Sequence, residues 1–386
     1  MQKTDKHFQF LIYCTKSDLT KKEIAYLHTS ITDENISISH IIQLAYKHGI
    51  VPLVYKTIKQ LFHTKNSSLN IDNFLLKLQS HYKTISQRNM LMSAELIYLI
   101  KLFAKHNIDA LAFKGPTLAQ MAYGDITLRQ FGDLDILIKK EDIDKIDILF
   151  KKSGYQHLLP LTSVQTSVRL KYAKDLSFIH PSKGIHLEMH WAFLNQNYPI
   201  QMDLENFWLE TQEVKLNGNT MLTFSNENLL VYLAIHGSKH LWERIIWLKD
   251  IDLFIQRNEI NWGKLINKVS ETGFEKMVYL ALHLNVILFQ TALPASIRNE
   301  IKKYPQVVQL SHFIFESWIT QKNSFQTTYM QTKLLPGLKA KFIYLRTRLL
   351  QPSLDEYLYI NLPKGLQWGY FLIKPYRLIK KNVFKN

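Results

Sequence analysis

The sequence predicts an α+β fold, in which a small mixed sheet with an α/β core is flanked by helical regions on both sides. Two observations lead to this prediction. Short apolar runs that alternate like strands are confined to residues 108–223. Residues 1–107 and 224–386 instead have apolar side chains at helical spacing. We therefore expect an N-terminal helical region (1–107), a central core (108–223) and a C-terminal helical region with a basic tail (224–386).

The N-terminal region is predicted to be helical throughout. Residues Ile38 to Phe62 have apolar groups at helical spacing, with a break between Gly49 and Pro52. Leu78 to His106 reads as one long amphipathic helix that ends before the first strand. His48 and His106 are expected to be surface or capping residues.

The core begins with a strand that leads into a turn and a short helix. Ile108 to Phe113 is an apolar run typical of a buried strand, and Lys114-Gly115-Pro116 ends it. Thr117 to Tyr123 is predicted to be helical. A Lys-Gly turn between a strand and a helix presents backbone N–H groups and a positive dipole to an anion, which suits phosphate.

Two aspartates precede the next apolar run of the core. In Gly132-Asp133-Leu134-Asp135 the alternation of a strand points Asp133 and Asp135 to one face and Leu134 to the other. Two carboxylates on one face repel each other unless a positive charge lies between them. Oxygen ligands suit Mg²⁺, and Mg²⁺ in turn suits phosphates. A solvated pair at the edge of a strand is the plain alternative.

A third carboxylate is predicted to lie beside these two. Leu176–His180 and Ile185–Trp191 read as strands joined by a hairpin turn at residues 181–184. In the second strand His186, Glu188 and His190 share one face. We expect this hairpin to bring Glu188 next to Asp133 and Asp135.

The C-terminal region is predicted to open with a helix from about Ser225 to about Leu241. His236 and His240 are four residues apart and so share a face, which Arg244 and Trp247 are expected to continue. Their functional interpretation is a contact with metal or phosphate, and the alternative is a structural role. The metalloprotease pattern HExxH is absent from the sequence.

The charge of the chain favours an anionic partner. The net charge is +16, and residues 333–386 contain eleven Lys or Arg against two acidic residues. Basic residues alternate with large aromatic ones in this tail, so a peripheral contact with an anionic membrane or with nucleic acid is one interpretation. A solvated helix face is the other. No apolar run is long enough to predict a transmembrane helix.

The quoted motifs resemble those of the bacterial uncharacterised nucleotidyltransferase family, within the DNA polymerase beta-like nucleotidyltransferase superfamily. The resemblance rests on KGPTLAQMAYGDITLRQFGDLDILI, HLEMHW and HGSKHLWERIIWLKDID. It departs from the superfamily pattern at Gly115-Pro116, which replaces Gly-Ser, and at Glu188, which replaces Asp. The spacing between Gly115 and Asp133 is also longer than in compact members.

The resemblance implies transfer of a nucleoside monophosphate from a nucleoside triphosphate, ATP among them, to an unidentified hydroxyl or phosphate acceptor. Asp133, Asp135 and Glu188 are expected to be the catalytic residues and to hold two Mg²⁺ ions. Lys114, Gly115 and Arg129 are expected to bind the triphosphate. His236, His240, Arg244 and Asp250 are expected to line the nucleotide or acceptor side of the cleft.

Two other functions are consistent with the sequence. The chain could be a catalytically inactive nucleotide-binding module with a regulatory or interaction role, because the serine of Gly-Ser is missing. It could also be a metal-dependent hydrolase built on His236 and His240. The single Cys14 excludes a disulfide framework. Together with an N-terminus that lacks a signal-peptide pattern, it leads us to expect a cytoplasmic protein.

Overall fold

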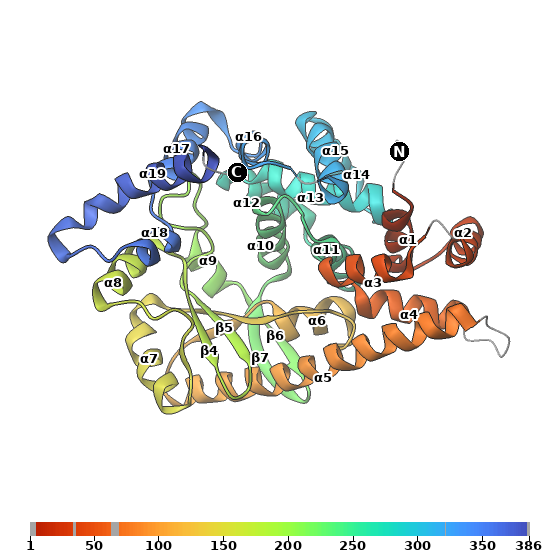
Figure 1. Cartoon of the computed structure of the whole chain (residues 1–386), viewed down its shortest axis with the longest axis horizontal. Coiled ribbons are helices and arrows are strands. Elements are labelled where there is room, and N and C mark those ends of the chain that lie inside the picture. Colours follow the sequence, from red (N-terminus) through yellow and green to blue (C-terminus); the bar gives the residue numbers. More distant parts are fainter. Residues whose placement is uncertain (1–4, 34–35, 63–68, 321, 384–386) are drawn as a thin grey trace.

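A five-stranded mixed sheet lies at the centre of the protein, with helices on both faces (Figure 1). The structure is a computed structural model that describes residues 5–33, 36–62, 69–320 and 322–383. The strand order is β1-β2-β5-β4-β3. Only β2 and β5 run parallel to each other, and the other neighbours are antiparallel. The bounds are β1 Ala110–Ala112, β2 Asp133–Ile138, β3 Gln156–His157, β4 Asp175–His180 and β5 Ile185–His190. The predicted α+β class is therefore confirmed.

One face of the sheet packs on two helices of the same half of the molecule. Leu134, Ile136, Leu187 and Met189 point to this side and are almost fully buried. They meet apolar residues of α5 (Leu69–Lys105) and α7 (Ile143–Lys152), and α5 runs along the whole length of the sheet (Figure 1). The alternation in β2 and β5 thus separates an apolar face from the face where the aspartates lie, as the sequence predicts.

The N-terminal helices confirm the predicted break in Ile38–Phe62. The chain forms α3 (Ile38–Lys47) and α4 (Val51–Phe62), with a left-handed Gly49 between them. They are preceded by α1 (Lys6–Thr15) and α2 (Lys21–Thr32). The long predicted helix begins earlier than expected, because α5 extends from Leu69 to Lys105.

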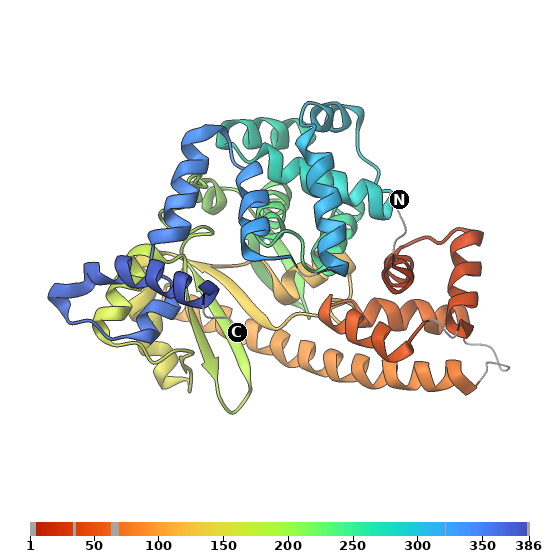
Figure 2. The ribbon, with the colours of Figure 1, turned by 45° about the horizontal axis from the view of Figure 1, so that its top comes forward.

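The C-terminal half is helical and covers the other face of the sheet (Figure 2). A separate hairpin, β6 (Thr211–Leu216) with β7 (Asn219–Phe224), leads into it. Ser225 caps the first helix, as predicted, by accepting a hydrogen bond from the backbone N–H of Asn228. The helices are α10 Asn226–Lys239, α11 Ile245–Arg257, α12 Trp262–Thr272, α13 Glu275–Phe289, α14 Ala295–Lys302, α15 Gln306–Ile319, α16 Ser324–Lys333, α17 Gly337–Leu350, α18 Leu354–Tyr359 and α19 Tyr370–Val383.

The helices at the two ends of the sheet region match most of the local predictions. A short helix that Asp203 caps, α9 (Leu204–Leu209), precedes the β6–β7 hairpin. The helix predicted to reach about Leu241 ends at Lys239, and Leu241 and Trp242 adopt positive φ, so Arg244 does not continue its face. His48 is the C-cap of α3, as one of the two predicted roles requires, but its side chain is completely buried.

A continuous apolar core joins the N-terminal helices, the site-bearing face of the sheet and the C-terminal helices. It includes Phe10 of α1, Leu137 of β2, Leu233 of α10 and Leu310 of α15. The division at residues 107 and 223 stays a prediction. Among the described helices, none combines the length and the apolar character that crossing a bilayer requires.

His48 makes the stability of this core depend on pH. Its ring packs against Phe8 and Trp318, with ring centroids 5.3 and 6.1 Å away, and its Nδ1 accepts a hydrogen bond from the backbone N–H of Ile245. Burial lowers the pKa of His48 to about 3, and the nearby Lys47 and Arg244 add to the effect. The unfolded chain binds this proton near pH 6.5, so stability should fall as the pH decreases from 6.5 towards 3.

We expect the loss to be about 1.4 kcal/mol per pH unit from this one group. Urea unfolding at pH 6.5 and pH 5.0 should therefore show a drop in free energy that is about 1.6 kcal/mol smaller for His48→Phe than for the wild type, since the unfolded histidine is already half protonated at pH 6.5. Equal drops in the two proteins would show that His48 is protonated in the folded state.

Candidate active site

The site is built on the two parallel strands at the centre of the sheet. In the register of β2 and β5, Asp133 lies opposite His186 and Asp135 lies opposite Glu188. The 181–184 turn makes β4 and β5 an antiparallel hairpin, as predicted, and this places β5 directly beside β2. Glu188 is thus brought next to Asp135 by strand pairing across 53 positions of sequence.

His190 links the two carboxylates. Its Nε2 lies 3.2 Å from Oδ1 of Asp135 and 3.3 Å from Oε2 of Glu188. Ligand atoms of Asp135, Glu188 and His190 all lie within 4.8 Å of one another. Asp133 lies outside this group of three, one step along the same face of β2.

The turn after β1 brings a lysine to the same carboxylates. Lys114 is the N-cap of α6 (Gly115–Tyr123), and its Nζ lies 3.1 Å from Oδ1 of Asp135. Gly115 has φ +55°, and a β-carbon there would lie 3.3 Å from the carbonyl oxygen of Asp133. Glycine is required at this position because the backbone of α6 begins in close contact with β2. The first turn of α6 thus starts beside the aspartates.

Burial and charge act on these groups in opposite directions. Burial alone would raise the pKa of Asp135, but Lys114 and His190 hold it well below its usual value. Burial and the neighbouring Asp135 raise the pKa of Asp133. Glu188 is far more accessible than Asp135, because 34% of its side chain is exposed against 1%. The cluster therefore contains one carboxylate that is readily ionised, Asp135, one whose ionisation Asp135 opposes, Asp133, and one that solvent reaches, Glu188.

Arg129 lies next to the cluster but binds another carboxylate. Its Nε and Nη2 each donate to Asp250 of α11 at 2.8 Å, and Tyr123 of α6 donates to the same carboxylate at 2.8 Å. All three side chains are buried. Two of the guanidinium donors are thus used within the protein, and the predicted triphosphate contact of Arg129 stays a prediction. The triad fixes α6 to α11.

His236 and His240 form an aromatic cluster with Trp247. Their ring centroids are 5.0 Å apart, and each lies within 5.5 Å of the Trp247 ring. Trp247 reaches them from α11, because the chain reverses between the two helices. The ring of Trp242 packs directly against the α-carbon of Gly237, which leaves no room for a side chain there. Burial holds the pKa of His236 well below its usual value, and Lys114 contributes.

Arg244 lies apart from this cluster. It precedes α11, and its Nε donates to the backbone carbonyl of Lys47 at 3.1 Å. The expectation that it continues the face of His236 and His240 depends on an unbroken helix and is wrong. In the described part of the chain, the group with metal-ligand geometry includes neither His236 nor His240. The hydrolase interpretation therefore gains no support.

The carboxylates fit a divalent cation. Oδ2 of Asp135 is buried and has no hydrogen-bond partner among the described residues. Burying an ionised oxygen costs free energy unless a cation or a hydrogen-bond donor contacts it. Asp133, Asp135 and Glu188 offer the oxygen donors that Mg²⁺ prefers, and the hydrogen bonds from His190 orient two of them.

The family model described as uncharacterised nucleotidyltransferase matches residues 34–290 of the chain. The chain belongs to this family. The match extends from α3 to the end of α13, so it includes the carboxylate cluster, the Lys114 turn and the histidine cluster. No curated protein matches the sequence.

A solved structure of an antigenic nucleotidyltransferase-like protein from Paracoccidioides brasiliensis is similar to part of the chain. The identity is 15%, the TM-score is 0.32, and the similarity covers 57% of this chain and 91% of the other. A TM-score at this level gives no argument about the site. The assignment to the nucleotidyltransferase family rests on the family model, and it implies a nucleotide substrate.

Sequence reasoning missed three residues on the elements around the carboxylate cluster. His190 was expected only to share the face of Glu188, since alternation gives a side but not a distance. Lys174 precedes β4 and forms an ion pair with Asp175, which lies opposite His190. Thr117, in the first turn of α6, has a buried hydroxyl without a partner among the described residues. A hydroxyl at this point of a Gly-Pro-Thr turn is the signal that could have been noticed.

Proposed function

We propose that the chain is a metal-dependent nucleotidyltransferase that moves a nucleoside monophosphate from a nucleoside triphosphate to a hydroxyl or phosphate acceptor. Asp133, Asp135 and Glu188 would hold Mg²⁺, with two ions expected. The observation that supports this best is the register of β2 and β5, which gives three carboxylates on one face beside a lysine at a helix N-terminus. A cytoplasmic location and a bacterial source stay predictions.

The residues at the two ends of the carboxylate cluster would have different roles, one in binding the triphosphate and the other in binding the acceptor. Lys114 and the first N–H groups of α6 would bind the triphosphate, since a helix N-terminus favours an anion. Bound Mg²⁺ would supply charge stabilisation for the attacking and leaving oxygens. Glu188, being partly exposed, would orient the acceptor and receive its proton. His190 would keep the carboxylates of Asp135 and Glu188 in position.

The experiment that tests this function is calorimetry with each of the four nucleoside triphosphates and Mg²⁺. It compares the wild type with an Asp133→Asn/Asp135→Asn double variant. We expect the wild type to bind one triphosphate only when Mg²⁺ is present, and the double variant to lose that binding. Thermal unfolding of both proteins is the control for the fold, because the double variant leaves Lys114 without its partner.

Two other outcomes of this titration would change the account. Metal-dependent binding without any release of pyrophosphate would favour the inactive nucleotide-binding module. Binding of equal strength in the double variant would exclude Asp133 and Asp135 as the site.

We also propose that the basic tail contacts an anionic membrane surface. Half of the exposed large apolar side chains among the described residues lie between Leu338 and Ile379. Leu338 is 83% exposed, Trp368 is 61% exposed and Leu372 is 63% exposed. Basic residues lie among them, which is the composition of a segment that rests on an anionic lipid surface.

Flotation with vesicles tests the membrane contact. The wild type should float with vesicles of phosphatidylcholine and phosphatidylglycerol but not with phosphatidylcholine alone. Trp368→Glu should reduce binding by about tenfold, because an apolar contact becomes a charge of the wrong sign. Phe325→Glu is the matched control, since Phe325 is 82% exposed but lies on α16, outside the Leu338–Ile379 segment. Equal flotation of the two variants, or retention of RNA in place of vesicles, would contradict the proposal.

A further inference from the structure

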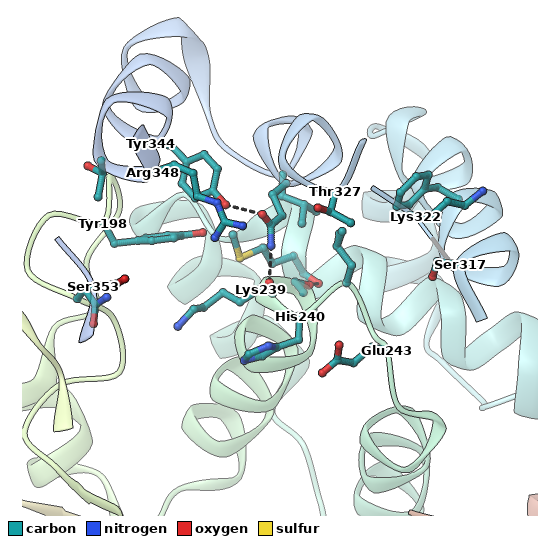
Figure 3. A pocket seen from close by; sticks show the side chains of 18 of the residues that line it. Tyr198, Lys239, His240, Glu243, Ser317, Lys322, Thr327, Tyr344, Arg348 and Ser353 are labelled. Atoms are coloured by element: carbon teal, nitrogen blue, oxygen red, sulfur yellow. Dashed lines mark hydrogen bonds between the residues drawn. The ribbon is translucent and has the colours of Figure 1, made fainter. Parts of the chain in front are cut away.

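A large cavity opens between the end of α10 and the C-terminal helices (Figure 3). Its volume is about 960 Å³, which lies in the range of small-molecule binding sites. Its walls come from α10, from the loop after β5 and from α15, α16, α17 and α19. The cavity is therefore surrounded by elements that lie far apart in the sequence.

The lining of this cavity is strongly basic. The lining contains one carboxylate, Glu243, and six cationic side chains: Lys47, Lys174, Lys239, Lys322, Arg348 and Lys374. Lys174 pairs with Asp175, and Lys322 pairs with Glu316. The other four have no ion-pair partner in the described part of the chain, although Lys374 donates to the carbonyl of Gln351. Unpaired cations around one cavity repel each other, so an anion bound there is stabilised.

Two lysines of the cavity lining, Lys174 and Lys239, lie near the carboxylate cluster, although the carboxylates themselves do not line the cavity. Lys174 immediately precedes β4, and its partner Asp175 lies 3.9 Å from Nδ1 of His190. Lys239 is the last residue of α10, and burial together with Lys174 lowers its pKa to about 8, while Asp175 and Glu188 act in the opposite direction. Lys174 therefore lies on the β5 side of the cluster, and Lys239 lies close enough for Lys174, Glu188 and also Lys114 to shift its pKa.

The strand order separates this side from the Lys114 side. Lys114 follows β1, which pairs with β2, whereas Lys174 precedes β4, which pairs with β5. The carboxylates on β2 and β5 lie between the two lysines. The turn at Lys114 has the helix N-terminus suited to a triphosphate, so the second basic side is available for the other substrate.

Aromatic side chains form part of the cavity wall beside the cations. Tyr198 and Tyr344 pack edge to face with their ring centroids 5.9 Å apart. Tyr344 donates to Gln331, and Gln331 donates to the backbone carbonyl of Lys239 at 2.6 Å. In Figure 3 this chain of hydrogen bonds joins α17 to the end of α10, and Arg348 extends from α17 next to Tyr344. Aromatic rings next to cations suit a compact organic molecule that has a phosphate group.

We infer that this cavity binds the acceptor of the reaction, and that the acceptor is a small phosphorylated molecule. The identity of the ligand as an acceptor rests on the proposed function. The presence of an anion site depends only on the residues that line the cavity. The cations would hold the phosphate, and an acceptor oxygen would face Glu188. That oxygen forms a bond to the α-phosphorus, the bond from the α-phosphorus to the bridging oxygen breaks, and pyrophosphate leaves with the electron pair. A hydroxyl acceptor gives its proton to Glu188.

Binding of inorganic phosphate tests the cavity without nucleotide. Protein freed of metal by chelation and dialysis is titrated with phosphate, so that the triphosphate site does not contribute. Arg348→Gln should weaken phosphate binding by at least about tenfold, because a charge-assisted contact is lost. Arg346→Gln is the matched control: it is an exposed arginine of the same helix, but it does not line the cavity. Absence of phosphate binding in the wild type, or equal binding by Arg348→Gln, would overturn the inference.

Label transfer identifies the class of acceptor. Wild type, Mg²⁺ and α-labelled triphosphates are mixed with the small-molecule filtrate of a cell extract, with RNA or with lipid. Label should enter the filtrate, and treating the filtrate beforehand with a phosphatase that is then removed should abolish the signal. Arg348→Gln should raise KM for the filtrate acceptor about tenfold and leave KM for the triphosphate within about twofold.

The two tests distinguish failure of the inference from failure of the proposed function. Label in RNA, in lipid or in a phosphatase-resistant acceptor would overturn the inference and keep the nucleotidyl transfer. Absence of triphosphate binding and of transfer would remove the proposed function, and the phosphate titration would still decide whether the cavity is an anion site.

Discussion

The Glu188→Gln variant is expected to fold as the wild type does and to lose nucleotidyl transfer by about 1,000-fold. The carboxylate would be removed without a change in shape, and the site would lose a metal ligand and a proton acceptor together. Metal-ion stabilisation is worth several kcal/mol, and each 1.36 kcal/mol corresponds to a factor of ten. Stability should change little, because Glu188 is partly exposed and its carboxylate lies against His190.

Release of labelled pyrophosphate from a γ-labelled triphosphate, in the presence of the cell-extract filtrate, measures this loss. Glu210→Gln is the matched control, because the same substitution removes a carboxylate that is 28% exposed and pairs with Lys264 and Lys268 away from the sheet. Activity of Glu188→Gln within tenfold of the wild type would exclude Glu188 from the chemistry.

The Asp250→Ala variant is expected to lose about 3–5 kcal/mol of unfolding free energy. Asp250 accepts two hydrogen bonds from Arg129 and one from Tyr123, and all three residues are buried. Removing the carboxylate leaves a guanidinium without a counter-charge inside the protein. Urea unfolding followed by circular dichroism measures the difference.

Two comparisons separate this effect from a general loss of charge. Asp109→Ala removes an aspartate that is 66% exposed and pairs with Lys139, and it should cost at most about 1 kcal/mol. The double variant Arg129→Met/Asp250→Leu should recover most of the stability, because neither partner is left unpaired. If Asp250→Ala is no more harmful than Asp109→Ala, the triad does not stabilise the fold.

The position of the three carboxylates on one face of the sheet could be predicted from the sequence, because strand alternation is a local property. Asp133 and Asp135 were placed on one face by the period of two, and the turn at residues 181–184 specified the hairpin that contains Glu188. The register of β2 against β5 depends on contacts between distant segments. Strand period alone therefore could not show that His190 would lie 3.2 Å from Asp135.

Contacts between distant elements could not be predicted. The partner of Arg129 is one of them, because Asp250 is 121 residues away and is reached through the packing of α6 on α11. Arg244 was expected to continue the face of His236 and His240, and nothing local predicted the positive φ of Leu241 and Trp242. The tail was considered only as a surface, whereas Arg348 and Lys374 line the cavity.

The measurement that tests the central claim most directly is a crystal structure with Mn²⁺ and a non-hydrolysable triphosphate. Mn²⁺ replaces Mg²⁺ at oxygen-rich sites, and its anomalous signal locates it without reference to the protein. We predict anomalous peaks bounded by Asp133, Asp135 and Glu188, with the triphosphate extending towards Lys114 and Gly115. A peak at His236 and His240, or a triphosphate bound away from β2 and β5, would contradict the account.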